Sequence, residues 1–191
     1  MEILKNKILE EGYSLPGNIL KVDSFLNHQI DPEVTIAMGK EFAKRFREEK
    51  IDKVVTIESS GIAIALAAAH EIGTKLVFAR KNKSVLMQED RYSCDITSFT
   101  KKETKSVYIL KKFLTPGERI LIVDDFLADG NAALGLCNIV EQAGCKVVGI
   151  GIAIEKSFQR GAGRIKDAGY RLESLARIKS LADSKIIFEE E

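Results

Sequence analysis

The chain has 191 residues, of which 45% are hydrophobic and 30% charged, and these values predict one globular domain that needs neither disulfides nor metals to form its core. The 29 basic and 28 acidic side chains give a net charge of +1, which disfavours a dedicated nucleic-acid-binding protein. The longest apolar run, Ile62–Ala69, is too short for a membrane-spanning helix, which needs about 20 residues.

Cysteine and histidine content bears on the cellular setting and on metal chemistry. Cys94, Cys137 and Cys145 make an odd count without a C-x-x-C pair, and the first residues lack the apolar segment of a signal peptide. We therefore expect reduced thiols and a cytoplasmic protein. His28 and His70 are isolated, which disfavours a zinc site, and His70 is interpreted as a structural residue of a buried helix.

The N-terminal part of the chain alternates between helical and strand patterns. Asp31 and Pro32 mark a helix start, because aspartate accepts hydrogen bonds from the first N–H groups and proline fits the first helical position. The αβαβ order predicts a right-handed βαβ unit and a parallel sheet. The expected elements are a helix over 3–10, a turn over 15–18, a strand over 19–25, a helix from 31 to about 50, a strand over 53–57, a helix over 62–72 and a strand over 76–79.

Residues 81–119 break this alternation, because they are polar and their apolar stretches are too short for core helices. Ser106–Leu110 fits one strand of a hairpin. Long irregular inserts in compact domains often act as mobile lids. We therefore expect a flexible lid over about 82–112.

Regularity returns after the insert. The pattern predicts a strand over 119–123, a helix from about 133 that ends at Gly144, a strand over 147–154, and a mixed tail over 157–191 with a short strand near 185–188. Together these elements predict an α/β fold with a parallel sheet and helices on both of its faces.

The junction after the strand over 119–123 is the sharpest candidate site. Asp124 and Asp125 follow the strand, and a short loop with Gly130 leads into the next helix. Ligands of α/β sheets bind at the carboxyl ends of strands, and a helix N-terminus binds phosphate. Because carboxylates suit sugar hydroxyls or a hydrated magnesium ion, the junction predicts a sugar-phosphate site. On the residues alone, an exposed strand end with Asp129 as helix cap explains the pattern equally well.

Three further segments follow predicted strands and face the same sheet edge. Glu58–Gly61 has small residues whose N–H groups can form an anion-binding nest, although a plain helix cap by Ser59 or Ser60 also fits. Arg80–Lys81 suits pyrophosphate or a solvated basic loop. Lys156 ends the strand over 147–154 and reaches either the same crevice or solvent.

Residues 120–133 resemble the phosphoribosyl-pyrophosphate signature of the type I phosphoribosyltransferases, with four apolar residues, two acids and a glycine-containing loop in register. Residues 15–29 and 149–159 are similar to the branch of that family that acts on xanthine, and the similarity extends essentially from end to end. One departure concerns the loop over 128–132, which lacks the threonines and second glycine common in the family, so phosphate must be held mainly by backbone N–H groups.

The resemblance implies a reaction in which a purine base, xanthine in this branch, attacks C1′ of phosphoribosyl pyrophosphate and displaces pyrophosphate. It also implies Mg²⁺ carried by pyrophosphate and the ribose hydroxyls, a homodimer, a core over 31–155 and a hood over the base from 1–30 and 156–191. The implied roles are 5′-phosphate binding by Ala128, Asp129, Gly130, Asn131 and Ala132; ribose binding and charge stabilisation by Asp124 and Asp125; pyrophosphate binding by Glu58, Ser59, Ser60, Gly61, Arg80 and Lys81; and base binding by Leu20, Asn27 and Lys156.

Lys156 also has a physical rationale, since a lysine donates three hydrogen bonds and accepts none. It therefore favours a 6-oxo purine over adenine.

Two alternatives to a phosphoribosyltransferase remain. A regulatory protein that binds phosphoribosyl pyrophosphate without chemistry is disfavoured by the short segment before Asp31 and by the balanced charge. A flavodoxin-like or Rossmann-type nucleotide-binding protein is disfavoured because the three-glycine dinucleotide fingerprint is missing.

Overall fold

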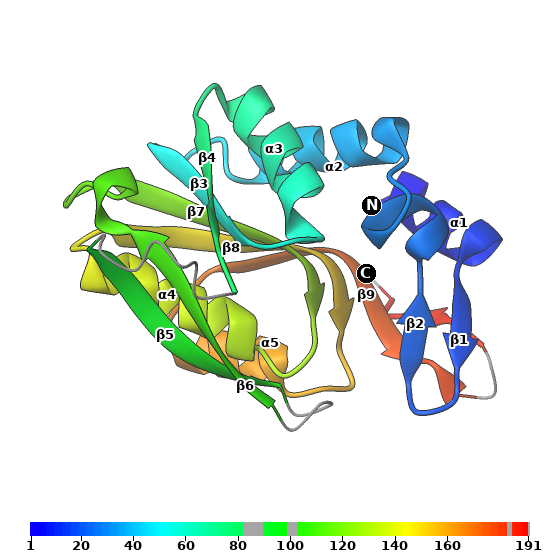
Figure 1. The fold of residues 1–191 in the computed structure, drawn as a ribbon. Coiled ribbons are helices and arrows are strands. Elements are labelled where there is room, and N and C mark those ends of the chain that lie inside the picture. The colour runs from blue at the N-terminus through cyan, green and yellow to red at the C-terminus, as the bar shows by residue number, and fades with distance from the viewer. Residues whose placement is uncertain (82–89, 99–102, 183–184, 191) are drawn as a thin grey trace.

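The computed structural model describes residues 1–81, 90–98, 103–182 and 185–190. A six-stranded sheet with the order β10-β9-β8-β7-β3-β4 forms its centre (Figure 1). The five strands from β9 to β4 are parallel, and only β10 pairs antiparallel. The strands are β3 (Lys53–Ile57), β4 (Lys75–Ala79), β7 (Arg119–Leu127), β8 (Lys146–Lys156), β9 (Leu172–Ser180) and β10 (Ile187–Phe188).

Helices cover both faces of this sheet, which confirms the predicted α/β fold. Helices α2 (Pro32–Arg45) and α3 (Gly61–Ile72) lie on one face, and α4 (Asn131–Gln142) and α5 (Gly161–Asp167) lie on the other (Figure 1). Helix α1 (Glu2–Glu11) lies beyond one end of the sheet. No helix within the described ranges is long and apolar enough to cross a membrane.

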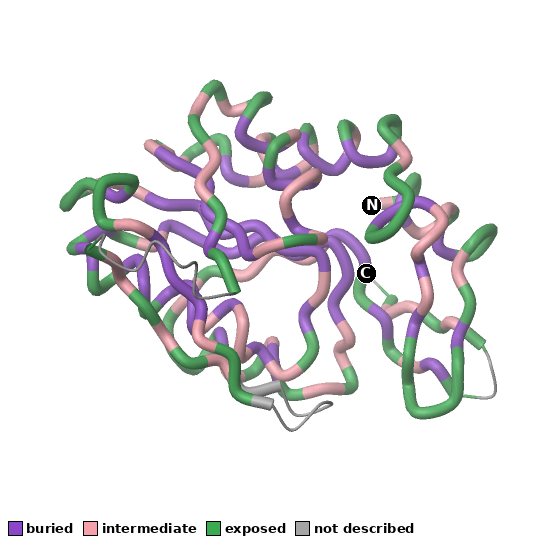
Figure 2. The backbone as a smooth tube through the Cα atoms, viewed as in Figure 1, coloured by how far each residue is buried: buried purple, intermediate pink, exposed green. Residues whose placement is uncertain are grey.

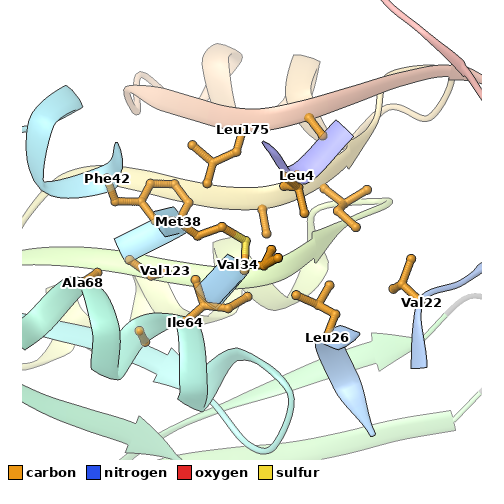
Figure 3. Close-up of a cluster of buried hydrophobic side chains, with 14 of the residues drawn as sticks. Leu4, Val22, Leu26, Val34, Met38, Phe42, Ile64, Ala68, Val123 and Leu175 are labelled. Carbon is orange, nitrogen blue, oxygen red and sulfur yellow. The ribbon is translucent and has the colours of Figure 1, made fainter. Parts of the chain in front are cut away.

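An apolar cluster fills the space between the sheet and each layer of helices, and the central strands are almost entirely buried (Figure 2). The cluster under α2 and α3 also takes in α1 and β9, which are distant in sequence (Figure 3). Its buried side chains include Leu4, Met38, Phe42, Ile64, Val123 and Leu175.

The helix that begins at Asp31 is confirmed, although it is shorter than expected. The Asp31 carboxylate accepts hydrogen bonds from the N–H groups of Glu33 (3.0 Å) and Val34 (3.2 Å). The helix ends at Arg45 and not near Lys50.

The predicted strand over 19–25 is only partly correct. Strand β2 (Ile19–Lys21) pairs antiparallel with β1 (Tyr13–Leu15), and a π-helical turn follows over Asp23–Asn27. The expected helix over 62–72 is confirmed as α3, which ends at Gly73 with φ 80°. His70 lies on this helix but is exposed, which corrects the expectation of a buried helix face there.

The insert is more regular than its composition suggests. β5 (Arg91–Ser98) and β6 (Glu103–Leu110) form an antiparallel hairpin, followed by a 3₁₀ turn (Lys111–Phe113). The strand predicted over Ser106–Leu110 is confirmed, whereas its partner β5 was missed because polar residues dominate it. Residues 82–89 and 99–102 of the expected lid lie outside the described residues.

The C-terminal tail contributes a strand to the sheet. Residues 172–180, which belong to the segment expected to form part of a hood, form β9 and pair parallel with β8 in the central sheet. The short strand expected near 185–188 is confirmed as β10. The β1–β2 hairpin packs against this region, where the Ser14 hydroxyl donates to the carbonyl of Leu181 at 2.9 Å. The first and last segments of the chain therefore lie side by side.

Close packing between α2 and β8 gives a stability prediction. A Cβ atom added at Gly151 would lie 2.7 Å from Cε1 of the Phe42 ring, and both residues are buried. We expect Gly151→Ala to lower the free energy of unfolding by about 1–3 kcal/mol, because overpacking forces the ring aside. Urea unfolding monitored by circular dichroism measures this change.

Gly163→Ala is the matched control, since nothing lies within 4 Å of a Cβ atom added at this helical position. It should leave stability unchanged or raise it by up to about 1 kcal/mol through helix propensity. Equal effects of the two substitutions would contradict the packing argument.

Candidate active site

Strand β7 carries two neighbouring carboxylates into the interior. Asp124 and Asp125 are 5% and 8% exposed, so the alternative of an exposed strand end is wrong. The Asp124 Oδ1 atom accepts a hydrogen bond from the N–H group of Asp125 at 3.0 Å. Both residues belong to the strand itself, which continues to Leu127 and not, as expected, only to Val123.

Burial changes the acidity of Asp124. Removal from water, followed by the charge of Asp125, raises the pKa of Asp124 well above its usual value, and Lys81 opposes the shift. A buried carboxyl of this kind is available to a ligand that brings positive charge or hydroxyl groups, because such a ligand replaces the lost water.

The β3–α3 turn lies directly against these carboxylates. A Cβ atom at Gly61 would lie 2.6 Å from the Asp124 Oδ1 atom and 2.3 Å from the Thr56 Oγ1 atom, so only glycine permits this approach. Ser60 is the N-cap residue of α3, but its hydroxyl caps no N–H group of that helix in the described structure. The alternative of a plain side-chain cap therefore does not hold for Ser60.

Glu58 connects this turn to the basic pair that follows β4. Its Oε1 atom accepts a hydrogen bond from the N–H group of Lys81 at 2.6 Å, and its Oε2 atom lies 3.7 Å from Nε of Arg80. Arg80 also pairs through its backbone with Tyr108 of β6. The carboxylate of Glu58 thus anchors the backbone at Lys81 and pairs with the Arg80 guanidinium, and it does not itself suit an anion.

One pocket of about 340 Å³ collects these groups. Six of the predicted site residues line it, and they come from the β3–α3 turn, the segment after β4, β7 and the start of α4: Glu58, Ser60, Lys81, Asp124, Asp125 and Ala132. Sequence reasoning missed the other lining residues, which are Ile57, Ile96, Lys105, Val107 and Phe126. The period of two along β7 was the available signal for Phe126, since residues 124 and 126 of a strand point to the same side.

The loop over 128–132 leads from β7 into α4. Gly130, with φ 81°, is the N-cap residue of that helix, so the alternative that Asp129 caps it is wrong. The Asp129 carboxylate instead lies 3.4 Å from Nε of Arg160. Only Ala132 of this loop lines the pocket described above, and the first N–H groups of α4 lack carbonyl partners within their helix.

The three residues expected to bind the base are not part of the described lining of this pocket. The Lys156 Nζ atom donates to the carbonyl of Asn18 at 2.8 Å and lies 5.9 Å from the ring centre of Phe126, which does line the pocket. Burial lowers the pKa of Lys156. Leu20 is buried in β2, whereas Asn27 is exposed at the end of the π-helical turn. Lys156 is therefore next to the pocket, because its ammonium group lies over the ring of a lining residue, Phe126.

Comparison with known proteins identifies the family. Residues 27–180 match the family described as "Phosphoribosyl transferase domain". The chain belongs to this phosphoribosyl transferase family. It is 57% identical over 188 residues to the xanthine phosphoribosyltransferase of Bacillus cytotoxicus, covering 98% of this chain and 95% of that protein. A protein of the same name from Bacillus thuringiensis is 54% identical with the same coverage.

Solved structures agree with this assignment. The adenine phosphoribosyltransferase of Thermoanaerobacter pseudethanolicus has a TM-score of 0.68 at 27% identity, over 77% of this chain and 82% of that one. The APRTase of Giardia lamblia complexed with 9-deazaadenine has a TM-score of 0.79 at 23% identity, over 93% and 98%, and shares the fold. The chain is therefore a phosphoribosyl-transferring enzyme, and the resemblance found in the sequence is confirmed.

The buried carboxylate pair yields a prediction on stability and pH. Above its raised pKa the folded protein holds Asp124 charged beside Asp125, at a cost that the unfolded chain does not have. We expect Asp124→Asn to raise the melting temperature of the ligand-free phosphoribosyltransferase at pH 8 by about 2–4 °C, or about 1 kcal/mol, and to reduce its turnover.

The difference should shrink as the pH falls, because the native carboxyl then becomes neutral as well. Differential scanning calorimetry at pH 5 to 8 measures it, with Asp167→Asn on the exposed end of α5 as the control. A difference that grows at lower pH would contradict the raised pKa of Asp124.

Proposed function

We propose that this phosphoribosyltransferase transfers the 5-phosphoribosyl group from phosphoribosyl pyrophosphate to xanthine, giving xanthosine 5′-monophosphate and pyrophosphate. The observation that carries the proposal is the pocket in which Asp124 and Asp125 meet the Glu58–Gly61 turn, Lys81 and the start of α4. The proposed base follows from the xanthine phosphoribosyltransferases, which are 54–57% identical over nearly the whole chain. The product is a nucleotide salvaged from a free purine.

Asp124 and Asp125 are assigned to the ribose. Their carboxylates accept hydrogen bonds from the two ring hydroxyls and stabilise the positive charge that develops near C1′ when pyrophosphate leaves. Their burial supports this role, because a charge interaction is stronger where water is excluded. Residues 128–132 are assigned to the 5′-phosphate at the other end of the sugar, where the N-terminus of α4 offers N–H groups.

Pyrophosphate is assigned to the turn over Glu58–Gly61 and to Arg80 and Lys81. The N–H groups of the turn donate hydrogen bonds to the leaving group and the two cations neutralise its charge. Glu58 supports this arrangement by accepting a hydrogen bond from the backbone N–H group of Lys81 and by pairing with Arg80. The hairpin residues Ile96, Lys105 and Val107 line the same pocket, which supports a role of the insert in excluding water.

Magnesium fits this site as a companion of the substrate. Asp124 and Asp125 are neighbouring carboxylates in the pocket lining, and the described residues contain no cluster of three or more acidic, histidine or cysteine side chains that could hold a metal by themselves. Mg²⁺ favours one or two carboxylates together with phosphate oxygens. When bound, it neutralises charge on pyrophosphate, while Asp124 and Asp125 orient the ribose.

Lys156, Leu20 and Asn27 are assigned to the base. Lys156 reaches over the Phe126 ring, and its N–H groups suit the 6-oxo group of xanthine. Adenine carries an amino group at this position, so the Lys156 ammonium and the adenine amino group would face each other as two donors without an acceptor. Such a mismatch discriminates strongly between bases.

We also propose that the enzyme acts as a cytoplasmic homodimer. Large apolar side chains are exposed on α2, α3 and β4, namely Ile36 (48%), Leu66 (58%) and Phe78 (41%). Exposed apolar residues on adjacent elements favour a protein interface. All three cysteines are free, as is typical of proteins in a reducing compartment.

A product assay tests the proposed reaction. The protein, magnesium and phosphoribosyl pyrophosphate are incubated separately with xanthine, hypoxanthine, guanine and adenine, and nucleotide formation is followed by chromatography. We expect the highest kcat/KM with xanthine and no product with adenine. A preference for another base would overturn the proposed specificity. Binding of phosphoribosyl pyrophosphate without any product would favour a regulatory role.

The role of Lys156 is tested by Lys156→Ala. The loss of its hydrogen bonds to the base should raise the KM for xanthine by about 10- to 100-fold and leave the Kd of phosphoribosyl pyrophosphate nearly unchanged. Lys146→Ala, at the exposed opposite end of β8, is the matched control. Equal losses for both substrates would count against a base-specific role.

A further inference from the structure

The first turn of helix α5 packs against the loop over 128–132. The N–H group of Gly161, its first residue, donates to the carbonyl of Ala128 at 3.0 Å. A Cβ atom added at Gly130 would lie 3.2 Å from the Cα atom of Gly161. The loop and the first turn of α5 therefore pack backbone against backbone.

Arg164 of α5 bridges the two sides of the loop. Its Nη1 atom donates to the backbone carbonyl of Asp129 at 2.5 Å and to the Oδ1 atom of Asn131 at 2.6 Å. The two acceptors flank Gly130, the residue with φ 81°. An arginine has no acceptor, so the amide oxygen of Asn131 must face it. One guanidinium thus fixes a backbone carbonyl before the glycine and a side chain after it.

This bridge determines the direction in which one loop amide points. The peptide between Asp129 and Gly130 is trans and planar, so its N–H group points opposite to its carbonyl. Since the carbonyl of Asp129 is held by Arg164, the N–H group of Gly130 is directed to the other side of the loop. The orientation of such amides matters here because the loop has no hydroxyl side chain to hold phosphate.

We propose that Arg164 is a positioning residue for the 5′-phosphate, which holds the loop over 128–132 in the conformation that directs its N–H groups to the ligand. The inference rests on the proposed function. Arg164 acts through Asp129 and Asn131 and does not itself contact the reacting atoms. Arg160 assists through its ion pair with the Asp129 carboxylate.

The test separates the two ends of the substrate. Ribose 5-phosphate and magnesium pyrophosphate are titrated separately into the wild-type protein and into Arg164→Gln by calorimetry. We expect the Kd of ribose 5-phosphate to rise about 10- to 100-fold, as for loss of charged hydrogen bonds, and the Kd of pyrophosphate to change less than about twofold. The KM for phosphoribosyl pyrophosphate should rise more than kcat falls.

Two further variants complete the experiment. Lys166→Gln removes a positive charge from an exposed position of the same helix and should leave both affinities within about twofold, which distinguishes position from net charge. Arg164→Lys retains the charge and should recover part of the lost affinity for ribose 5-phosphate. It also provides a folded variant if Arg164→Gln is unstable, with the melting temperature measured for each.

The outcomes are distinct. Unchanged ribose 5-phosphate affinity in Arg164→Gln, or equal loss of both ligands, overturns the inference, provided the wild-type sample forms xanthosine 5′-monophosphate. A wild-type protein that forms no product with any base overturns the proposed function, and the inference with it. A wild-type protein that forms product but does not bind ribose 5-phosphate overturns only the role assigned to the loop and Arg164.

Discussion

Parallel pairing of β4, β3, β7 and β8 is the constraint on which the site depends. Because the strands run in one direction, their carboxyl ends lie at one edge, and the segments that follow them converge there. The Glu58–Gly61 turn, Arg80–Lys81 and the start of α4 are far apart in sequence but neighbours at this edge. The order β4-β3-β7-β8 places β7, with its two carboxylates, between the turn after β3 and Lys156 at the end of β8. The sheet thereby arranges candidate leaving-group, sugar and base contacts in sequence across its edge.

The largest unfavourable contribution to the folding free energy at this site comes from the buried carboxyl of Asp124. Its side chain is buried against Gly61 and beside Asp125, and the raised pKa reflects the lack of water. Such a site is destabilising while it is empty and favourable when a cationic or hydroxyl-bearing ligand is bound. The apolar clusters on both faces of the sheet stabilise the fold and offset the unfavourable free energy of burying Asp124. Gly61 cannot be exchanged for a larger residue without displacing the Asp124 carboxylate. The first residue of helix α3 and the position of this carboxylate therefore depend on each other.

The sequence predicted those parts of the fold that are determined locally. Asp31 and Pro32 set a helix start through their own hydrogen bonds and backbone angles, and the apolar strands over 53–57 and 119–123 are recognisable because both of their faces are buried. The elements that were missed depend on distant partners. α5 has seven residues, two of them glycine, and its position comes from packing on the 128–132 loop. β9 mixes polar and apolar residues, and becomes a strand because β8 offers an edge.

The candidate site shows the same division. Residues that follow strands were found because the carboxyl end of a strand is a position that sequence reveals, and six of them line one pocket. The raised pKa of Asp124 was not predictable, since it depends on burial in the folded chain and on the neighbouring carboxylate. Arg164 escaped notice for another reason. Its two acceptors lie more than thirty residues earlier in the chain, and no local pattern marks an arginine that bonds a backbone carbonyl.

The contact between the two ends of the chain has a consequence for synthesis on the ribosome. Leu4 and Ile8 of α1 are fully buried in the cluster that contains Leu175 and Ile178 of β9, and the N-terminal amino group donates to the carbonyl of Leu175. At about 5–20 residues per second, the first helix waits roughly 10–30 s before its partner strand is made. During that interval the part of its apolar face that packs on β9 has no partner strand, so this contact between α1 and β9 forms late in synthesis.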